Sequence, residues 1–213
     1  ITGDAYVDHP SFAAAILSRV LENAGFRVGI IAQPPWKGLE ADESFLRFGQ
    51  PRLAWLVSAG AMDSMVAHYT ANNKPRSSDA YSPGGKTGFR PDRALLAYCS
   101  KIREISKNKP IVIGGIEASM RRFGHYDYWS NTVRHSILLD TKADVLVYGM
   151  GEKPLLELAE RLASHANKTL TEPAFSGIRG TMWRTGKREL VPEGAVYLPE
   201  FLEIRKDPDS YCR

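Results

Sequence analysis

The sequence is poor in cysteine, with only Cys99 and Cys212 among its 213 residues. The two lie far apart, one in a helical pattern and one next to the last residue, so neither a disulfide framework nor a thiolate metal site is predicted. Long apolar runs are also lacking, because no stretch approaches the roughly 20 residues that span a bilayer, and no signal peptide precedes the fold. These absences favour a reducing, cytoplasmic setting without a membrane partner.

An excess of one charge is equally lacking. The chain has 28 Lys and Arg against 24 Asp and Glu, a net charge of +4 and a pI of about 9.0. This balance favours an anionic ligand, but it is too weak and too evenly spread to support nucleic-acid binding, which it does not exclude. The chain also begins at Ile1 without a methionine, and we interpret it as a piece of a longer protein.

The common sequence motifs for cofactor and nucleophile chemistry are missing. A dinucleotide fingerprint needs G-x-G-x-x-G after the first strand, but the first loop reads GDAYVDHPS, and in GMGEKP Pro154 stands at the third glycine. There is no Walker A sequence, no nucleophile elbow, no H-E-x-x-H and no close Cys/His set. We therefore assign no catalytic residue and no metal ligand to this chain.

What the sequence does contain is an alternation of apolar runs with amphipathic helical patterns. The runs end near residue 3 and cover residues 27–32, 53–59, 111–113 and 143–148. Helical patterns cover residues 12–25, 39–48, 91–108 and 152–167. Alternation of this kind implies right-handed crossovers, and the sequence predicts an α/β, three-layer domain with a five-stranded parallel sheet of order 2-1-3-4-5.

The last part of the chain differs in character. Residues 1–167 are predicted to form the α/β domain and residues 168–213 a connector. Within the connector, Thr181 to Arg184 and Glu189 to Val191 are predicted to pair as a small β-hairpin. Earlier in the chain, Val133 to Leu139 is interpreted as a short helix or extended turn.

A long insertion follows the third strand. Residues 60–90 are rich in Gly, Ser, Asn and Pro, with a short helix predicted near Met62 to His68. Its aromatic residues Tyr69, Tyr81 and Phe89 favour a lid or a surface packed on a partner. The alternative is a loop that folds back and buries its own aromatics.

Polar side chains follow four of the predicted strands, and the densest group follows residues 111–113. Because ligands bind outside the carboxyl ends of parallel strands, these side chains are expected to surround one concavity. The alternative for Asp8 is a helix N-cap, for His125 a polar loop or capping role, and for Glu117 and Glu152 a structural ion pair with Arg121 or Arg122. The candidate residues are Asp8, His9, Asp63, Tyr69, Glu117, Arg121, Arg122, His125, Asp127 and Glu152.

Six polar blocks, in order, resemble the amino-terminal domain of the YgiQ-like radical SAM protein family. They are GDAYVDHPSF, GIIAQPPW, SAGAMDSMVAHYT, SDAYSPGG-x-x-G-x-RPDRA, GGIEASMRRFGHYDYW and YGMGE. The resemblance covers residue 1 to about residue 167 and is weaker through the connector. More distantly, GGIEAS and YGMGE after successive strands are similar to the cobalamin-binding-type domains that precede many radical SAM barrels.

The resemblance implies a flavodoxin-like, Rossmann-like domain of a larger enzyme whose separate barrel holds a [4Fe-4S] cluster and S-adenosylmethionine. This chain lacks the C-x-x-x-C-x-x-C motif that ligates such a cluster, so the resemblance places the chemistry downstream. It also lacks the D-x-H-x-x-G motif of some cobalamin domains, because Asp8 and His9 are adjacent. Cobalamin remains open, since other relatives of such domains bind it without that histidine.

Two functions follow from these features. The first is an accessory domain of a radical SAM enzyme, partnered by the downstream barrel and an unidentified substrate, whose strand-end loops wall the active site. The second is a stand-alone binding module for an anionic small molecule or a nucleic acid. The second would use Arg76, Arg90, Arg121 and Arg122.

Overall fold

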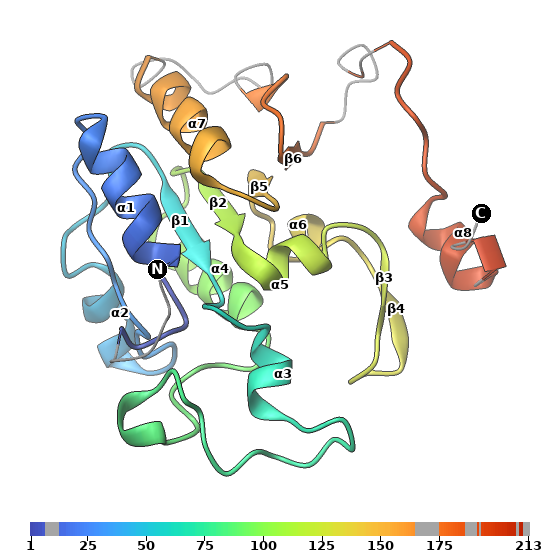
Figure 1. Ribbon diagram of the computed structural model, residues 1–213, viewed down its shortest axis with the longest axis horizontal. Coiled ribbons are helices and arrows are strands. Elements are labelled where there is room, and N and C mark those ends of the chain that lie inside the picture. Colours follow the sequence, from blue (N-terminus) through green and yellow to red (C-terminus); the bar gives the residue numbers. More distant parts are fainter. Residues whose placement is uncertain (7–12, 165–174, 186–190, 192, 208, 211–213) are drawn as a thin grey trace.

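The computed structural model describes residues 1–6, 13–164, 175–185, 191, 193–207 and 209–210. Figure 1 shows a central sheet flanked by helices, with a small hairpin and the last helix set to one side. The helices are α1 (Ala13–Asn23), α2 (Leu39–Phe45), α3 (Ser64–His68), α4 (Ala94–Ile105), α5 (Gly115–Met120), α6 (Ile137–Asp140), α7 (Glu152–Ser164) and α8 (Phe201–Lys206), with a 3-10 turn at Pro83–Gly85.

The main sheet has four strands in the order β1 (Trp55–Ser58), β2 (Ile111–Gly114), β5 (Val145–Val147) and β6 (Thr181–Trp183). The first three run parallel and β6 runs antiparallel to β5. Every residue of β5 is buried, as are the first three of β2. This burial explains why both strands read as continuous apolar runs rather than as alternating patterns.

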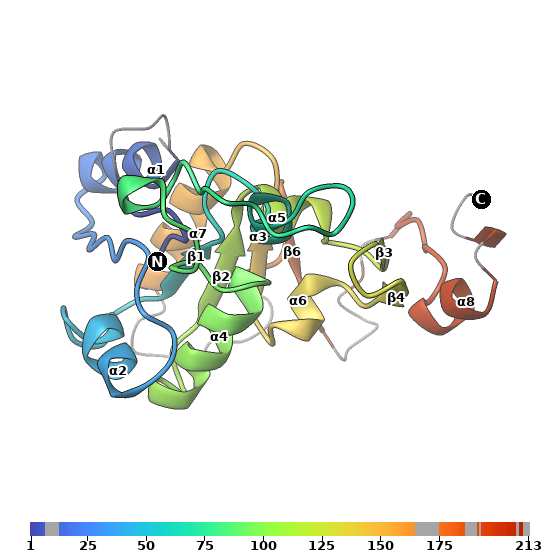
Figure 2. The ribbon, with the colours of Figure 1, turned by 90° about the horizontal axis from the view of Figure 1, so that it is seen from below.

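Helices cover both faces of this sheet, as Figure 2 shows. On one face, α1 and α7 bury Leu21, Leu155 and Leu158 against Val112 and Val145 of the sheet. On the other face, a second core contains Phe45 of α2 and Tyr98 and Ile102 of α4, together with Trp55 and Ile113 of the sheet. Amphipathic helices on both faces of a mostly parallel sheet give the predicted α/β class and three layers.

The prediction of a five-stranded parallel sheet is not met by the described residues, which form a mixed four-stranded sheet. Thr2 makes only single parallel bridges, one to Ala32 and one to Ser58. After Ala32, Gln33, with a φ of 43°, turns the backbone away before Pro34. Residues 27–32 therefore contribute a single bridge to Thr2, and Thr2 contributes a single bridge to Ser58 at the end of β1, in place of two strands.

The predicted pairing of Thr181 to Arg184 with Glu189 to Val191 is also corrected. Residues 181–183 form β6 and pair with β5, for example Leu146 with Met182, while residues 186–190 lie outside the described part of the chain. Met182 packs against one core and Trp183 against the other. Because successive side chains of a strand point to opposite faces, β6 forms the edge of the sheet and contributes one side chain to the core on each face.

A separate two-stranded hairpin was not predicted. It consists of β3 (His125–Asp127) and β4 (Thr132–Arg134), which are antiparallel with His125 opposite Arg134. Val133 to Leu139, expected as a short helix or extended turn, is divided between β4 and α6, whose first turn Ser136 caps. The hairpin lies beside α8 (Figure 1), and the rings of His135 and Phe201 stack with centroids 3.5 Å apart.

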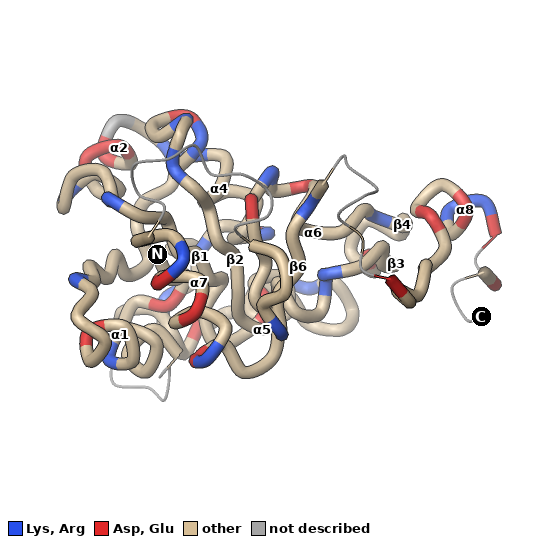
Figure 3. Tube along the Cα trace, turned by 90° about the horizontal axis from the view of Figure 1, so that it is seen from above, with Lys and Arg blue, Asp and Glu red and all other residues tan. Residues whose placement is uncertain are grey.

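Two further features concern the surface. Lys and Arg are interspersed with Asp and Glu along the trace in Figure 3, in agreement with the even charge balance of the sequence. Among the described residues, no helix combines the length and the apolar character that crossing a bilayer would require.

Candidate functional site

The segment after β1 and the segment after β2 are joined by an ion pair at the carboxyl edge of the sheet. Asp63 is the N-cap of α3. Its Oδ1 accepts hydrogen bonds from the backbone N–H groups of Met65 (3.0 Å) and Val66 (3.2 Å). Its Oδ2 accepts from Arg121 Nε at 2.8 Å and lies 2.7 Å from Arg121 Nη2. One carboxylate thus caps a helix and holds the arginine that ends α5.

Glu117 lies beneath this pair and is 1% exposed. Its Oε2 accepts from the backbone N–H (2.9 Å) and hydroxyl (2.6 Å) of Ser64, and its Oε1 accepts from the backbone N–H of Leu95 (3.2 Å). Burial, followed by the charge of Asp63, raises the pKa of Glu117, and these hydrogen bonds partly oppose the rise. Glu117 therefore connects α5 to the first turns of α3 and α4.

Asp127 of β3 completes the arrangement. Its Oδ2 accepts from Arg93 Nη2 at 2.6 Å and its Oδ1 from Arg121 Nη1 at 3.3 Å. Burial alone would raise the pKa of Asp127, but the hydrogen bond from Ser130 and the charges of Arg93 and Arg121 outweigh burial and lower it. We call Asp63, Arg93, Glu117, Arg121 and Asp127 the Arg121 cluster.

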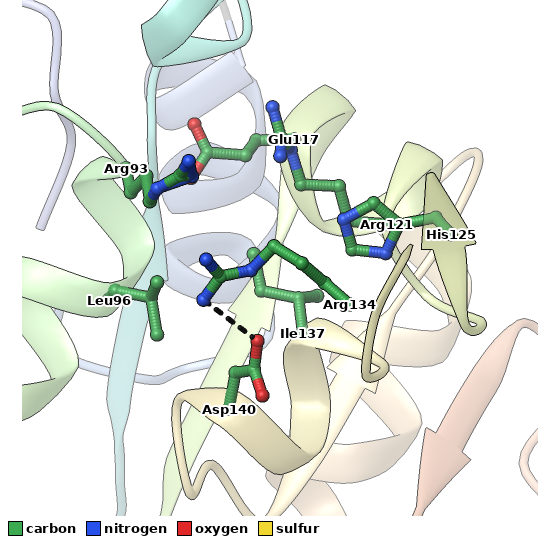
Figure 4. Close-up of a pocket in the computed structure, with 8 residues that line it drawn as sticks. All are labelled: Arg93, Leu96, Glu117, Arg121, His125, Arg134, Ile137 and Asp140. Carbon is green, nitrogen blue, oxygen red and sulfur yellow. Dashed lines mark hydrogen bonds and ion pairs between the residues drawn. The ribbon is translucent and has the colours of Figure 1, made fainter. Parts of the chain in front are cut away.

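A small hollow lies beside the Arg121 cluster, between α4, α5, the hairpin and α6. Figure 4 shows Arg93 on one side of it, Arg121 and His125 on the other, and Arg134 between them. Arg134 pairs with Asp140 at 3.3 Å. Both signs of charge therefore line this hollow. Its lining residues are Arg93, Leu96, Glu117, Arg121, His125, Arg134, Ile137 and Asp140.

His125 has a defined orientation in this hollow. Its Nδ1 lies 3.1 Å from the Phe123 carbonyl oxygen, and because a carbonyl only accepts, Nδ1 carries the hydrogen and Nε2 keeps its lone pair. Nε2 is buried, and among the described residues it has no hydrogen-bond partner. Burial lowers the pKa of His125, partly opposed by the Phe123 carbonyl, so the neutral imidazole is favoured. Chemically, His125 Nε2 offers the hollow a neutral hydrogen-bond acceptor beside arginine donors.

The structure brings together five of the predicted site residues and leaves others apart. Asp63, Glu117, Arg121 and Asp127 share the Arg121 cluster, and His125 lines the hollow beside it. Among the described residues, the ion pairs of Arg121 are to Asp63 and Asp127. The predicted ion pairs between Glu117 or Glu152 and the two arginines are therefore replaced by these pairs.

The remaining candidates occupy different surroundings. The Tyr69 hydroxyl donates to Asp92 at 2.8 Å. Arg122 donates to the Ser119 carbonyl at 2.6 Å, and Glu152 is the first residue of α7. The prediction that Asp8 and His9 lie at the same edge falls outside the described residues.

Sequence reasoning missed Arg93, Arg134 and Asp140. Arg93 stands just before α4 with a φ of 49°, a left-handed conformation that is uncommon for residues with a side chain. Its Nη1 is buried and, within the described part of the chain, has no hydrogen-bond partner. The only signal in the sequence was the RPDRA block, which does not show that residue 93 meets residue 127.

A second charged group lies deeper, where the long insertion crosses the start of the chain. The Arg90 side chain is fully buried, and Nη2 lies 3.0 Å from Asp4 Oδ1 and 3.3 Å from Asp79 Oδ2. Arg90 Nη1 donates to the Ala59 carbonyl at 2.7 Å. We call Asp4, Asp79 and Arg90 the Arg90 cluster.

The described residues do not form a site for a metal or an iron–sulfur cluster. No group of three or more His, Cys, Asp or Glu side chains among them is placed to hold a metal ion. Cys99 is completely buried, and burial raises the pKa of its thiol to about 12, which opposes the thiolate form that a cluster requires. Cys212 lies outside the described residues.

Comparison with known proteins gives one consistent family. The family described as Radical SAM N-terminal matches residues 1–213. A UPF0313 protein of Geobacter sulfurreducens is 53% identical over 214 residues, which cover all of this chain and 34% of the relative. UPF0313 proteins of Clostridium botulinum strain 657 and Clostridium perfringens strain 13 are each 51% identical over all of this chain, with 32% and 31% of the relatives covered. No solved structure matches significantly.

The chain therefore spans about a third of the length of the curated relatives it matches. The family description and the relatives' names do not mention cobalamin, and the arrangement of the described residues gives no support for it.

Proposed function

The chain belongs to the Radical SAM N-terminal family, and we propose that it serves as the accessory domain of a radical SAM enzyme. In this proposal the loops at the carboxyl edge of the sheet form part of the wall over the active site of a barrel further along the same polypeptide. The matched relatives are about three times as long as this chain. That difference leaves room for a barrel after the accessory domain.

The observation that carries the proposal is the contact between two loops that leave different strands. Arg121 reaches Asp63 across the edge, and the Tyr128 hydroxyl donates to the Ala71 carbonyl at 2.6 Å. The rings of Tyr69 and Trp129 lie 5.5 Å apart. The insertion and the segment 121–129 therefore form one continuous surface at the edge where α/β domains bind their ligands.

Aromatic residues remain exposed on this surface. Phe89, Phe123, Tyr126 and Tyr128 are between 41% and 58% exposed. Aromatic side chains are enriched in the centres of protein interfaces, and their exposure in this domain favours a contact with another part of the protein. Tyr69 and Trp129, which are half-buried against each other, represent the part of the loop that packs on itself.

The proposed role of these residues is positional. A radical SAM barrel supplies the [4Fe-4S] cluster and S-adenosylmethionine, and the donor set of the described residues does not fit the cluster. The contribution of this chain is to shape and shield the space over the barrel, with the Arg121 cluster holding two strand-end loops in place. A cytoplasmic location remains a prediction.

The alternative of a stand-alone anion-binding module has less support. Its four arginines are engaged within the domain: Arg90 in two buried ion pairs and Arg121 in two more. Arg76 donates to the carbonyls of Val66 and Tyr69, and Arg122 donates to that of Ser119. Arginines already paired in this way are less available to a phosphate.

The first test asks where the cluster is held. We expect the full-length protein to contain a C-x-x-x-C-x-x-C segment and to become brown on anaerobic reconstitution with iron and sulfide. The 213-residue chain, treated in the same way, should stay colourless. Stoichiometric thiolate-to-iron absorption by the isolated chain, or a full-length protein without the segment, would overturn the proposal.

The second test asks whether the edge surface is covered. Amides of residues 62–88 are expected to exchange hydrogen quickly in the isolated chain and slowly in the full-length protein, because an interdomain contact excludes water. Amides of the buried strand β2 serve as the control and should be protected in both. Equal protection of residues 62–88 in both proteins would instead indicate a self-packed loop.

A further inference from the structure

A group of exposed apolar side chains follows β2 and β5, on the face of α5 opposite Ala118. Ile116 and Met120 lie four positions apart in α5, so they are on one side of the helix. They are 44% and 65% exposed. The neighbouring residues Glu117 and Ala118 are buried. Helix α5 therefore presents an apolar side to the outside of the domain.

The turn after β5 extends this apolar side. The Gly149 backbone N–H donates to the Ser119 hydroxyl at 3.2 Å, which holds the turn against α5. Met150, the next residue, is 81% exposed. A long apolar side chain with this exposure contributes little to the domain's own core. Met150 follows Gly149 as Met120 follows Ser119, so the two methionines belong to the two segments that this hydrogen bond joins.

Arg122 links the turn after β5 to the turn after α5. Its guanidinium carbon lies 5.3 Å from the ring centre of Tyr148 and 4.7 Å from that of Phe123. Phe123 is 41% exposed. We call Ile116, Met120, Phe123 and Met150 the α5 patch; with Arg122 in its midst, its composition is that of an interface, where Met, aromatic residues and Arg are enriched.

The last described helix contacts the hairpin at a residue next to Phe123 of this patch. Helix α8 packs on the hairpin, and Ile204 Cδ1 lies 3.4 Å from the point where a Cβ on Gly124 would stand. Gly124 is the neighbour of Phe123, so α8, which lies beyond the hairpin in Figure 1, reaches the polypeptide next to one end of the α5 patch. In the relatives, a remainder about twice as long as this chain lies outside the matched region.

From these observations we infer that the α5 patch is the surface on which the downstream part of the same polypeptide packs. This inference rests on the proposed function and deepens it, because it names the residues that hold the two parts together. An apolar surface within reach of a remainder of that length can be covered intramolecularly. Such packing removes the patch from water without a second molecule and fixes the neighbouring Arg121 cluster over the downstream barrel.

Site-specific photo-crosslinking in the full-length protein tests the inference. The photoreactive residue p-benzoylphenylalanine replaces Met120 in one variant, Met150 in a second and Phe48 in a control. Phe48 is 63% exposed and follows α2, which lies well away from α5 in Figures 1 and 2. After irradiation and proteolysis, both patch variants should crosslink to peptides beyond residue 213 in a product of monomer mass, and the control should not.

Other outcomes overturn the inference. A product of dimer mass would assign the patch to a second copy of the protein, and crosslinks confined to residues 1–213 would show that the downstream part packs elsewhere. Cluster content distinguishes this failure from failure of the proposed function. A protein that holds its cluster but gives no such crosslink refutes only the α5 patch, whereas a protein without a cluster refutes the accessory role itself.

A charge variant gives a second measurement that does not depend on the photoreactive residue. Met120→Lys places an ammonium in the contact, where its burial is unfavourable. We expect protease cleavage between the two parts of the full-length protein to become roughly tenfold faster, because opening of the contact controls access. Phe48→Lys is the matched control. An unchanged cleavage rate for Met120→Lys would count against the inference.

Discussion

The Arg90 cluster and the Arg121 cluster are built from the same side-chain types but sit at different depths. The Arg90 side chain is 0% exposed between two carboxylates that are each 2% exposed. In the Arg121 cluster, Arg121 and Arg93 keep 14% and 22% of their side-chain surface exposed. The first cluster is closed to water, whereas the second borders the hollow and the exposed loop surface.

This difference separates a structural role from a candidate functional one. The Arg90 cluster ties the first residues of the chain to the end of β1 and to the insertion, and Arg90 is enclosed by Asp4, Asp79, the Ala59 carbonyl and the Tyr81 ring. The Arg121 cluster ties two strand-end loops together while leaving a nitrogen of Arg93 without a partner among the described residues. Arg90 Nε also lacks a hydrogen-bond partner among the described residues. The partial exposure of the Arg121 cluster beside the hollow, rather than its unpartnered nitrogen, therefore makes it the candidate for a contact with another molecule or domain.

The largest expected effect comes from Arg90→Met. It leaves Asp4 and Asp79 buried without their cation, and breaking a buried ion pair from one side costs about 3–5 kcal/mol. Denaturant unfolding should show this loss of stability. Arg76→Met is the control, since Arg76 is exposed and should cost below about 1 kcal/mol. Equal effects of the two variants would remove the distinction between the closed cluster and the surface.

The second prediction concerns the space inside the Arg90 cluster. In Gly60→Ala, the new Cβ would lie 2.0 Å from Asp4 Oδ1 and 2.7 Å from Arg90 Nη1, at a φ of +109°. Strain and overpacking together should cost about 2–4 kcal/mol of unfolding free energy. Gly84→Ala separates the two causes, because its φ is +61° but no atom lies within 4 Å; it should cost about 1 kcal/mol.

For the Arg121 cluster we predict a smaller, pH-dependent effect. Asp127→Asn keeps the side-chain shape but removes the charge facing Arg93 and Arg121, at an expected cost of about 1–2 kcal/mol near neutral pH. Because the folded-state pKa of Asp127 lies below 3.8, the wild-type advantage is fully present above that pH. It is lost as the pH falls through the lower folded-state pKa. Urea unfolding across this range should show the wild type and the variant converging in acid; a constant gap would exclude the charge as the cause.

The smallest effect is expected where the insertion meets the hairpin. Tyr128→Phe removes the hydrogen bond to the Ala71 carbonyl and should cost about 0.5–1 kcal/mol, because the exposed Ala71 carbonyl can accept from water instead. Hydrogen exchange should become faster near residues 69–73 and stay unchanged in β2. Tyr126→Phe is a matched control, since its hydroxyl bonds Asn131 within the hairpin and should leave residues 69–73 unaffected.

The sequence predicted the position of several site residues and missed their partners. Glu117, Arg121, His125 and Asp127 were expected together because they follow one strand within a short stretch. Asp63 was expected beside them because the carboxyl ends of parallel strands meet. Arg93 was not expected, since it lies just before a helix whose pattern looks ordinary, and nothing local indicates that its side chain bonds a residue 34 positions away.

By itself, the sequence determined the buried parallel strands β1, β2 and β5 and the helices α1, α4 and α7 that cover them. These elements follow from apolar patterns that repeat over a few residues, and burying those patterns requires the layers that form. Only the tertiary structure decided that β6 pairs with β5, that β3 and β4 form a hairpin, and that Arg90 meets both Asp4 and Asp79. Pairings between polar groups or short strands leave no periodic trace in a sequence. They depend on which distant segments the packed core brings within a few ångströms of each other.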